Sequence, residues 1–116
     1  MLHVNNLSRS KTLIDKGRVA DNPWSRFRGL MGVRHLEQGD GLLIDPCDNI
    51  HTHFMRIPID VLYVDANHRI VHIDPDMKPW RIGRRRSAAR FVIEMPSGVV
   101  KSTKTIVGDQ LQITVT

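Results

Sequence analysis

Cysteine and long apolar runs are the most evident absences from this sequence. Cys47 is the one cysteine, so no disulfide can form within the chain, and nothing points to an oxidising compartment. Apolar runs such as Gly41–Ile44 are far shorter than the ~20 residues that a transmembrane helix needs. The first residues also lack the basic start and apolar stretch of a signal peptide. We therefore expect a cytoplasmic protein with no membrane-spanning segment.

The overall composition excludes a disordered or multi-domain protein. The chain has 116 residues, of which 41% are hydrophobic and 25% are charged. This balance is typical of a globular protein, and the length suits a single domain spanning residues 1–116. No internal repeat, low-complexity segment or linker interrupts it.

Acidic residues are scarce in one part of the chain. Residues 77–108 contain eight lysines and arginines but a single acid, Glu94, whereas the other positions carry nine basic and eleven acidic residues. The net charge of +5 is therefore concentrated around Arg84, Arg85 and Arg86. Such a cluster can bind nucleic acid or a partner protein, but a solvated loop would have the same composition. Aromatic residues that could stack on bases do not alternate with these arginines.

Short apolar segments separated by turns dominate the rest of the sequence. Residues 1–20 favour a strand, a turn at Asp15–Gly17 and a second strand. Strict alternation places Leu111, Ile113 and Val115 on one face of a last strand. Regularly spaced short strands predict a mainly β fold, a small antiparallel β-sandwich or barrel. The expected strands lie at 42–44, 59–64, 69–73, 90–95 and 110–116, with 49–56 as a further candidate.

One short helix is predicted near residues 23–31. Asp21 or Asn22 can cap its first turn, and Pro23 suits the first helical position. Four apolar residues recur at helical spacing and would form a stripe. A helix this short does not persist alone, so we expect the stripe to pack against the core. The stripe consists of Trp24, Phe27, Leu30 and Met31.

The segment 47–56 concentrates side chains that can carry chemistry. On a strand, Cys47, His51, His53 and Met55 would share one face. Thiol, imidazole and thioether groups suit copper or zinc, so His51 and His53 with Cys47 or Met55 are a candidate metal site. The protein would then be a metal-binding protein or a metal-dependent enzyme. Alternate strand positions are about 6.5–7 Å apart, so Cys47 would reach this site only if the chain bends. The same residues also fit a cysteine nucleophile beside a histidine, or ordinary packing in the core.

Polar residues set inside apolar strands indicate a pocket instead. Asp60 lies between Ile59 and Val61, and a buried carboxylate needs a partner, although an aspartate on an edge strand would face water. We therefore favour a non-enzymatic binding module for a small or anionic ligand, and the sequence does not identify a cofactor. The expected ligand-binding residues are His51, Thr52, Arg56 and Asp60, with Trp80 and Arg81 at the rim.

Several motifs occur in a characteristic order along residues 10–115. They are Arg28–Gly32, Gly41–Ile44, Ile50–Val61, Pro79–Trp80, Glu94–Gly98 and Gly108–Asp109. This order resembles the domain-of-unknown-function family 192, and the Ile-His-Thr-x-x-Met-x-x-Pro-Ile-Asp motif is the most specific part. The resemblance implies a compact β-rich domain, common in prokaryotes, without an established reaction. It also implies that His51, Thr52, Met55, Pro58 and Asp60 matter, either for folding or for binding.

Overall fold

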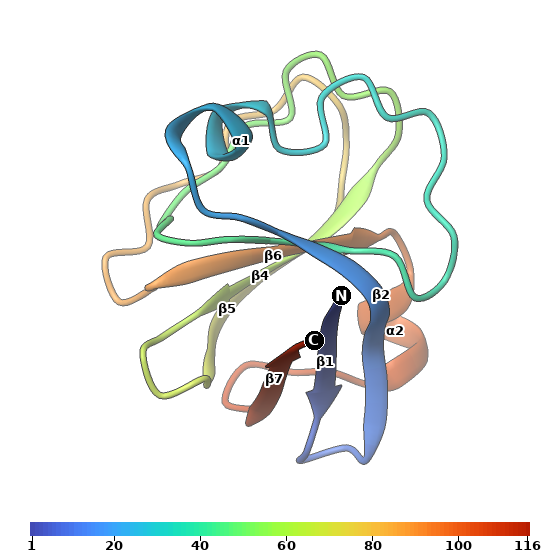
Figure 1. Cartoon of the computed structure of the whole chain (residues 1–116), viewed down its shortest axis with the longest axis vertical. Coiled ribbons are helices and arrows are strands. Elements are labelled where there is room, and N and C mark those ends of the chain that lie inside the picture. Colours follow the sequence, from blue (N-terminus) through green and yellow to red (C-terminus); the bar gives the residue numbers. More distant parts are fainter.

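The computed structural model describes all residues from 1 to 116 and shows a mainly β fold with two short helices (Figure 1). The predicted fold class is confirmed. No helix has both the length and the apolar character that crossing a bilayer requires. The helices are α1 (Pro23–Arg28) and α2 (Val99–Thr103). The strands are β1 (Leu2–Asn6), β2 (Lys11–Ala20), β3 (Leu42–Ile44), β4 (Ile59–Val64), β5 (Ile70–Met77), β6 (Phe91–Pro96) and β7 (Leu111–Val115).

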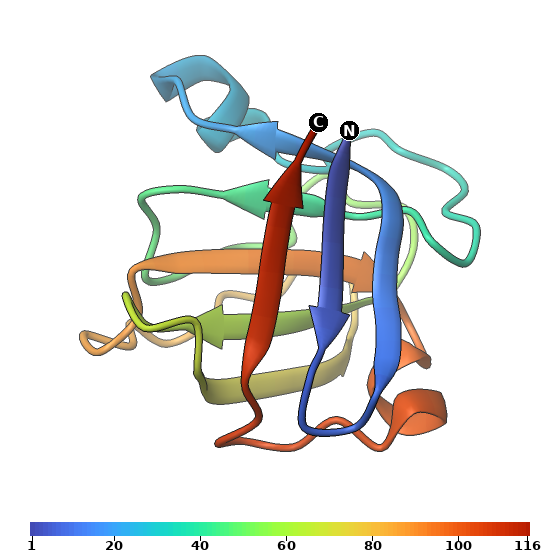
Figure 2. The same cartoon turned by 60° about the horizontal axis from the view of Figure 1, so that its bottom comes forward.

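The seven strands form one curled sheet in the order β5-β4-β6-β3-β2-β1-β7. Neighbouring strands are antiparallel, except that β2 and β3 are parallel. Figure 2 shows β7 and β1 running across the strands β3, β6 and β4 that lie behind them. The first and last strands of this order also approach each other, because Leu111 N–H donates to the His68 carbonyl and Ile70 N–H to the Asp109 carbonyl. The sheet is thus a half-barrel.

The long strand β2 connects the two parts of this curled sheet. Its beginning pairs with β1 and its end with β3, so the predicted turn at Asp15–Gly17 is wrong. The chain turns earlier, at residues 7–10. A Cβ atom on Gly17 would lie 2.6 Å from Ile14 Cγ2 and 3.0 Å from the Gly41 carbonyl oxygen. Glycine is therefore needed at this position for close packing and not for a turn.

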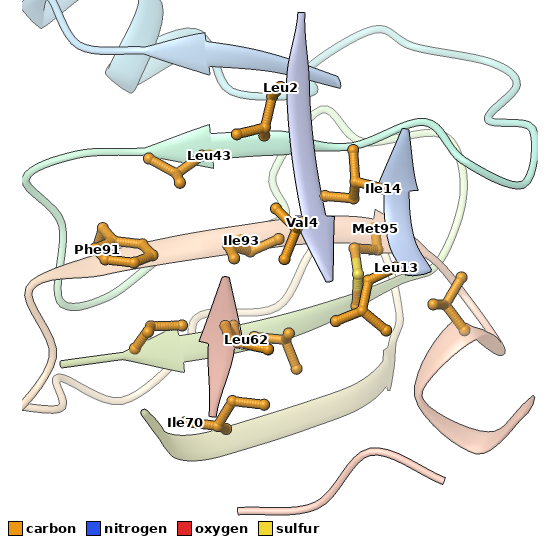
Figure 3. Close-up of a cluster of buried hydrophobic side chains, with 13 residues drawn as sticks. Leu2, Val4, Leu13, Ile14, Leu43, Leu62, Ile70, Phe91, Ile93 and Met95 are labelled. Atoms are coloured by element: carbon orange, nitrogen blue, oxygen red, sulfur yellow. The ribbon is translucent and has the colours of Figure 1, made fainter. Parts of the chain in front are cut away.

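Two apolar clusters lie on opposite faces of the central strands. Leu62 and Ile93 belong to the first cluster, which fills the half-barrel (Figure 3). Their neighbours Val61 and Val92 point the other way, into the second cluster. Leu30, Ile50 and Met55 complete this second cluster from outside the sheet. The site described below is built on the second face.

Helix α1 differs from the predicted core helix. Asn22 caps it as expected, because its side chain accepts a 2.9 Å hydrogen bond from Ser25 N–H. However, no residue of α1 is buried, and Trp24 and Phe27 are 69% and 61% exposed. Leu30 is buried, but it lies beyond the helix. The expected packing of the apolar stripe is therefore wrong for its two aromatic members.

Candidate functional site

The segment after β3 crosses the second cluster without forming a strand. Ile50, Thr52 and Met55 are buried, whereas Phe54 is exposed and has a φ of +62°. Burial therefore does not alternate along the segment, and the prediction of a strand at 49–56 is wrong. This irregular path allows Phe54 to project outward while its neighbours fill the core.

Thr52 attaches this segment to the loop that follows β5. Its hydroxyl donates to the Lys78 carbonyl and accepts from Arg81 N–H, both at 2.7 Å. Its own carbonyl accepts from Trp80 N–H at 2.9 Å. Thr52 is fully buried, so these bonds satisfy groups that would otherwise be costly to bury. The result is that Trp80 is held close to the 51–56 segment.

Asp60 lies on the opposite face of β4, together with Leu62 of the first cluster. Its Oδ2 accepts from Gly98 N–H at 3.1 Å and from Val100 N–H at 2.8 Å. Its Oδ1 accepts from Asp76 N–H at 2.8 Å. The buried carboxylate therefore joins β4 to the end of β5 and to the beginning of α2.

Exposed aromatic side chains come close together from α1, from the 51–56 segment and from the loop after β5. Figure 1 shows α1 at the end of the molecule where loops gather. Phe54 and Trp80 are 62% and 56% exposed, and their ring centroids are 4.9 Å apart. They belong to a series of six rings that begins at Trp24 on α1, and we call this series the aromatic row. It consists of Trp24, Phe27, His51, His53, Trp80 and Phe54, in this order. The centroids of successive rings are 6.2, 6.2, 5.2, 5.7 and 4.9 Å apart.

A cleft of about 540 Å³ lies against this row. Two arginines, Arg28 and Arg56, line it, and no acidic residue does. Neither arginine forms an ion pair within the chain. The cleft therefore presents ring surfaces beside two uncompensated positive charges. Its other lining residues are Trp24, Met31, Gly32, Phe54, Met55 and Trp80.

A smaller cavity of about 130 Å³ lies next to the cleft and is lined by Glu94 of β6. Glu94 is only 3% exposed, and its Oε2 has no hydrogen-bond partner. The backbone of Gly29, with a φ of +50°, passes close to the carboxyl, since a Cβ here would lie 3.6 Å from Oε1. Cleft and cavity share Arg28, Met31 and Met55 as a common wall.

Burial determines the protonation of the groups that line this cavity. Desolvation raises the pKa of Glu94 to about 8, because the carboxylate loses its hydration. Burial likewise raises the pKa of the Cys47 thiol. Burial, and then the neighbouring His53, lower the pKa of the His51 imidazole. At neutral pH the cavity thus contains a carboxylic acid, a thiol and an uncharged imidazole.

The structure does not bring the predicted metal ligands together. No group of three or more histidine, cysteine or acidic side chains is arranged to hold a metal ion. His51 and His53 are neighbours, but His51 Nδ1 accepts a 3.2 Å hydrogen bond from the His53 backbone N–H. The Cys47 thiol donates to the Asn49 carbonyl at 2.8 Å. His51 Nδ1 and the Cys47 thiol are thus engaged within the chain, and metal binding by these residues stays a prediction.

The basic loop is partly engaged by other side chains of the protein. Arg85 Nε forms a 2.8 Å ion pair with Asp48, and Arg86 bonds His72 Nε2 at 3.0 Å. Arg84 remains exposed beside Arg81 in a separate hollow of about 310 Å³. Binding of nucleic acid or a partner protein by this loop stays a prediction.

The site combines expected and unexpected residues. Of the residues expected to bind a ligand, Arg56 and Trp80 line the cleft, whereas Thr52, Asp60 and Arg81 do not. His51 and His53 lie in the aromatic row. Trp24 and Arg28 were missed, because the helical spacing of this segment favoured a core helix. Glu94 was also missed, although an acid inside the apolar strand Phe91–Met95 is the same signal that singled out Asp60.

Comparison with known proteins gives consistent results. The model of family DUF192, described as an uncharacterised ACR, matches residues 5–113. A UPF0127 protein of Pyrococcus horikoshii is 41% identical over 113 residues, which cover 91% of this chain and 96% of that protein. A UPF0127 protein of Pyrococcus abyssi is 40% identical over 113 residues, which cover 92% of this chain and 93% of that protein. A protein of unknown function from Novosphingobium aromaticivorans shares the fold, with a TM-score of 0.82, 18% identity and coverages of 96% and 82%.

Proposed function

The chain belongs to the DUF192 family, and from its cleft we propose that it is a non-enzymatic binding module for a small organic oxyanion that carries a planar ring. One observation carries this proposal. The cleft joins three exposed aromatic side chains to two arginines that no acid neutralises. Its volume of about 540 Å³ is that of a small-molecule site, for which about 300–1,000 Å³ is usual.

The aromatic residues supply the apolar part of the proposed site. Trp24, Phe54 and Trp80 leave more than half of their surface in water, although burying them would favour folding. Exposed apolar groups gathered around a hollow are typical of binding surfaces. A flat ring placed against these side chains would remove apolar surface from water on both partners.

The arginines determine the charge of the ligand. A guanidinium offers parallel N–H donors that match the oxygens of a carboxylate or a phosphate. Because Arg28 and Arg56 have no acidic neighbour in the cleft, they would repel a cation and attract an oxyanion. The two residues come from separate segments, the end of α1 and the loop before β4, so an anion between them would be held from two directions.

Tryptophan fluorescence tests this proposal directly, because both tryptophans of the chain line the cleft. We expect phenyl phosphate to change the emission saturably and to bind at least about tenfold more tightly than ribose 5-phosphate, which lacks the ring. Arg56→Met should weaken phenyl phosphate about tenfold through loss of a charged hydrogen bond.

The matched control for this experiment is Arg18→Met, since Arg18 is an exposed arginine of β2 that lies outside the cleft. It should leave the affinity unchanged. Absence of any saturable response to phenyl phosphate, or an equal loss in both variants, would contradict the proposal.

A stability measurement separates the binding role of the row from a folding role. Trp24→Ala should change the free energy of unfolding by less than about 0.5 kcal/mol, because the side chain is exposed. Leu62→Ala, in the first cluster, should cost about 2–5 kcal/mol. Urea denaturation of both variants checks this. Comparable losses would show that Trp24 supports the fold.

A further inference from the structure

We propose that the cavity lined by Glu94 is the inner part of the same site, and that its carboxyl pairs with the amide or amidine edge of a nitrogen heterocycle. This inference rests on the proposed function and specifies which kind of planar ring the ligand carries. The ligand class is then a heteroaromatic oxyanion, such as a nucleoside monophosphate, with the phosphate at the arginines and one edge of the base at Glu94.

The unpartnered carboxyl is the first observation behind this inference. Buried polar atoms in proteins nearly always have a hydrogen-bond partner, and an orphan is costly. Asp60 follows this rule, because three backbone N–H groups bind it. Glu94 is equally buried, yet its Oε2 has no partner and its side chain lines an open cavity. A group from outside the chain would supply the missing partner.

The chemistry of the carboxyl selects the kind of partner. A protonated carboxyl presents an O–H donor and a carbonyl acceptor side by side. The N–C=O and N–C–NH₂ edges of pyrimidine and purine bases present the complementary pair. Arg26 and Arg28 also line the cavity, so a cationic guest would meet two positive charges there. An uncharged ring edge avoids this repulsion.

The size and walls of the cavity determine how much of the ligand enters. A volume of about 130 Å³ accommodates part of a ring but not a whole nucleotide, so the remainder would lie in the cleft. The shared wall consists of Arg28, Met31 and Met55. These are unbranched side chains that can change rotamer to admit the ring. The lack of a side chain at Gly29 leaves room beside the carboxyl.

Comparing two ligands in three proteins tests the inference. Cytidine 5′-monophosphate has the ring edge and the phosphate, whereas phenyl phosphate has the ring and the phosphate alone. At pH 6.5 we expect the nucleotide to bind the wild type about tenfold more tightly than phenyl phosphate. Glu94→Met should abolish this difference without changing the affinity for phenyl phosphate. Glu94→Gln should retain it, because an amide also offers a donor and an acceptor.

Raising the pH to 9.5 provides a second readout. The wild type should lose the tenfold preference for the nucleotide, because the ionised carboxylate is an acceptor only, whereas Glu94→Gln should keep it. Cys47, His51, Arg26 and Arg28 also line the cavity, and all four are present in both proteins. A pH effect that persists in Glu94→Gln would therefore assign it to those groups and overturn the role of the carboxyl.

The outcomes distinguish the two proposals. If phenyl phosphate binds but the nucleotide has no advantage, or Glu94→Met retains that advantage, the inner site is wrong and the cleft proposal stands. If neither ligand binds, both proposals fail. A thermal melt of each variant confirms that the proteins compared are folded.

Discussion

Glu94→Gln is expected to stabilise the protein strongly at pH 8.5 and only slightly at pH 5. The pKa of Glu94 is about 8 in the folded protein, against an ordinary value of 4.5. Between these values the unfolded chain binds fewer protons than the folded one. The free energy of unfolding is therefore highest below the lower pKa, and it falls as the pH rises toward the upper pKa. Glutamine does not titrate, so the variant avoids this loss.

The size of this effect follows from the linkage between protonation and folding. Each unit of pKa difference corresponds to about 1.4 kcal/mol, so the gain at pH 8.5 should be on the order of 3–5 kcal/mol. Urea denaturation of both proteins at pH 5, 6, 7 and 8.5 measures this gain. Plotted against pH, the free energies of unfolding of the two proteins should diverge steadily. Parallel curves would show that Glu94 is ionised in the folded protein.

Glu37→Gln is the control for this measurement. Glu37 is exposed, and its hydrogen bond from Lys16 lowers the pKa of its carboxyl. A lowered pKa changes stability in the opposite direction, since the Glu37 carboxylate contributes stability that is lost as the pH falls. Glu37→Gln should therefore give no gain that grows with pH. A gain like that of Glu94→Gln would point to a general charge effect.

A buried acid that costs stability at neutral pH conflicts with the rest of this sequence, whose apolar patterns agree with the fold. Such local conflicts occur mainly at functional sites, where binding and not folding determines the residue. If urea denaturation measures such a cost at Glu94, it will support the assignment of this residue to the ligand site.

Most of the strands were predictable from the sequence. The alternation in β7 and the apolar run of β4 reflect local geometry, and Asn22 and Pro23 marked the beginning of α1 correctly. Gly17 could not be interpreted, because its role depends on the approach of Gly41 from a distant segment. Local patterns thus identified the elements, whereas tertiary contacts decided what single glycines do.

The site was less predictable, for a related reason. Asp60 and Glu94 have the same local pattern, an acid inside a buried strand. Asp60 receives N–H donors from Gly98 and Val100, 38 and 40 residues away, whereas Glu94 receives none at Oε2. The sequence contains no information on such partners. The local pattern is therefore the same for both acids, and it cannot distinguish the structural one from the one that faces a cavity.

Asp60→Ala is expected to destabilise the protein severely. Removing the carboxylate leaves the N–H groups of Asp76, Gly98 and Val100 without their acceptor at a buried junction. Unpaired buried donors cost about 1–3 kcal/mol each, and partial access of water would reduce the sum to about 3–5 kcal/mol. Asp60→Asn keeps one acceptor oxygen and should lose less.

Urea denaturation measures these losses, and amide hydrogen exchange at Gly98 and Val100 shows where they arise, because fraying of α2 would expose both groups. Asp76→Ala is the matched control, since the Asp76 carboxylate is exposed and binds Lys78 and Ser97 at the surface. It should cost much less than Asp60→Ala, and equal losses would contradict the structural role.

Asp60→Asn also tests the prediction from the sequence that Asp60 contacts a ligand. The carboxylate lies on the first-cluster face of β4, opposite the face that carries Glu94 and the cleft. Affinity for phenyl phosphate, measured on the folded fraction, should therefore be unchanged in Asp60→Asn and lowered in Arg56→Met. A selective loss of affinity in Asp60→Asn would place Asp60 in the site and would require a second ligand contact on the opposite side of the sheet.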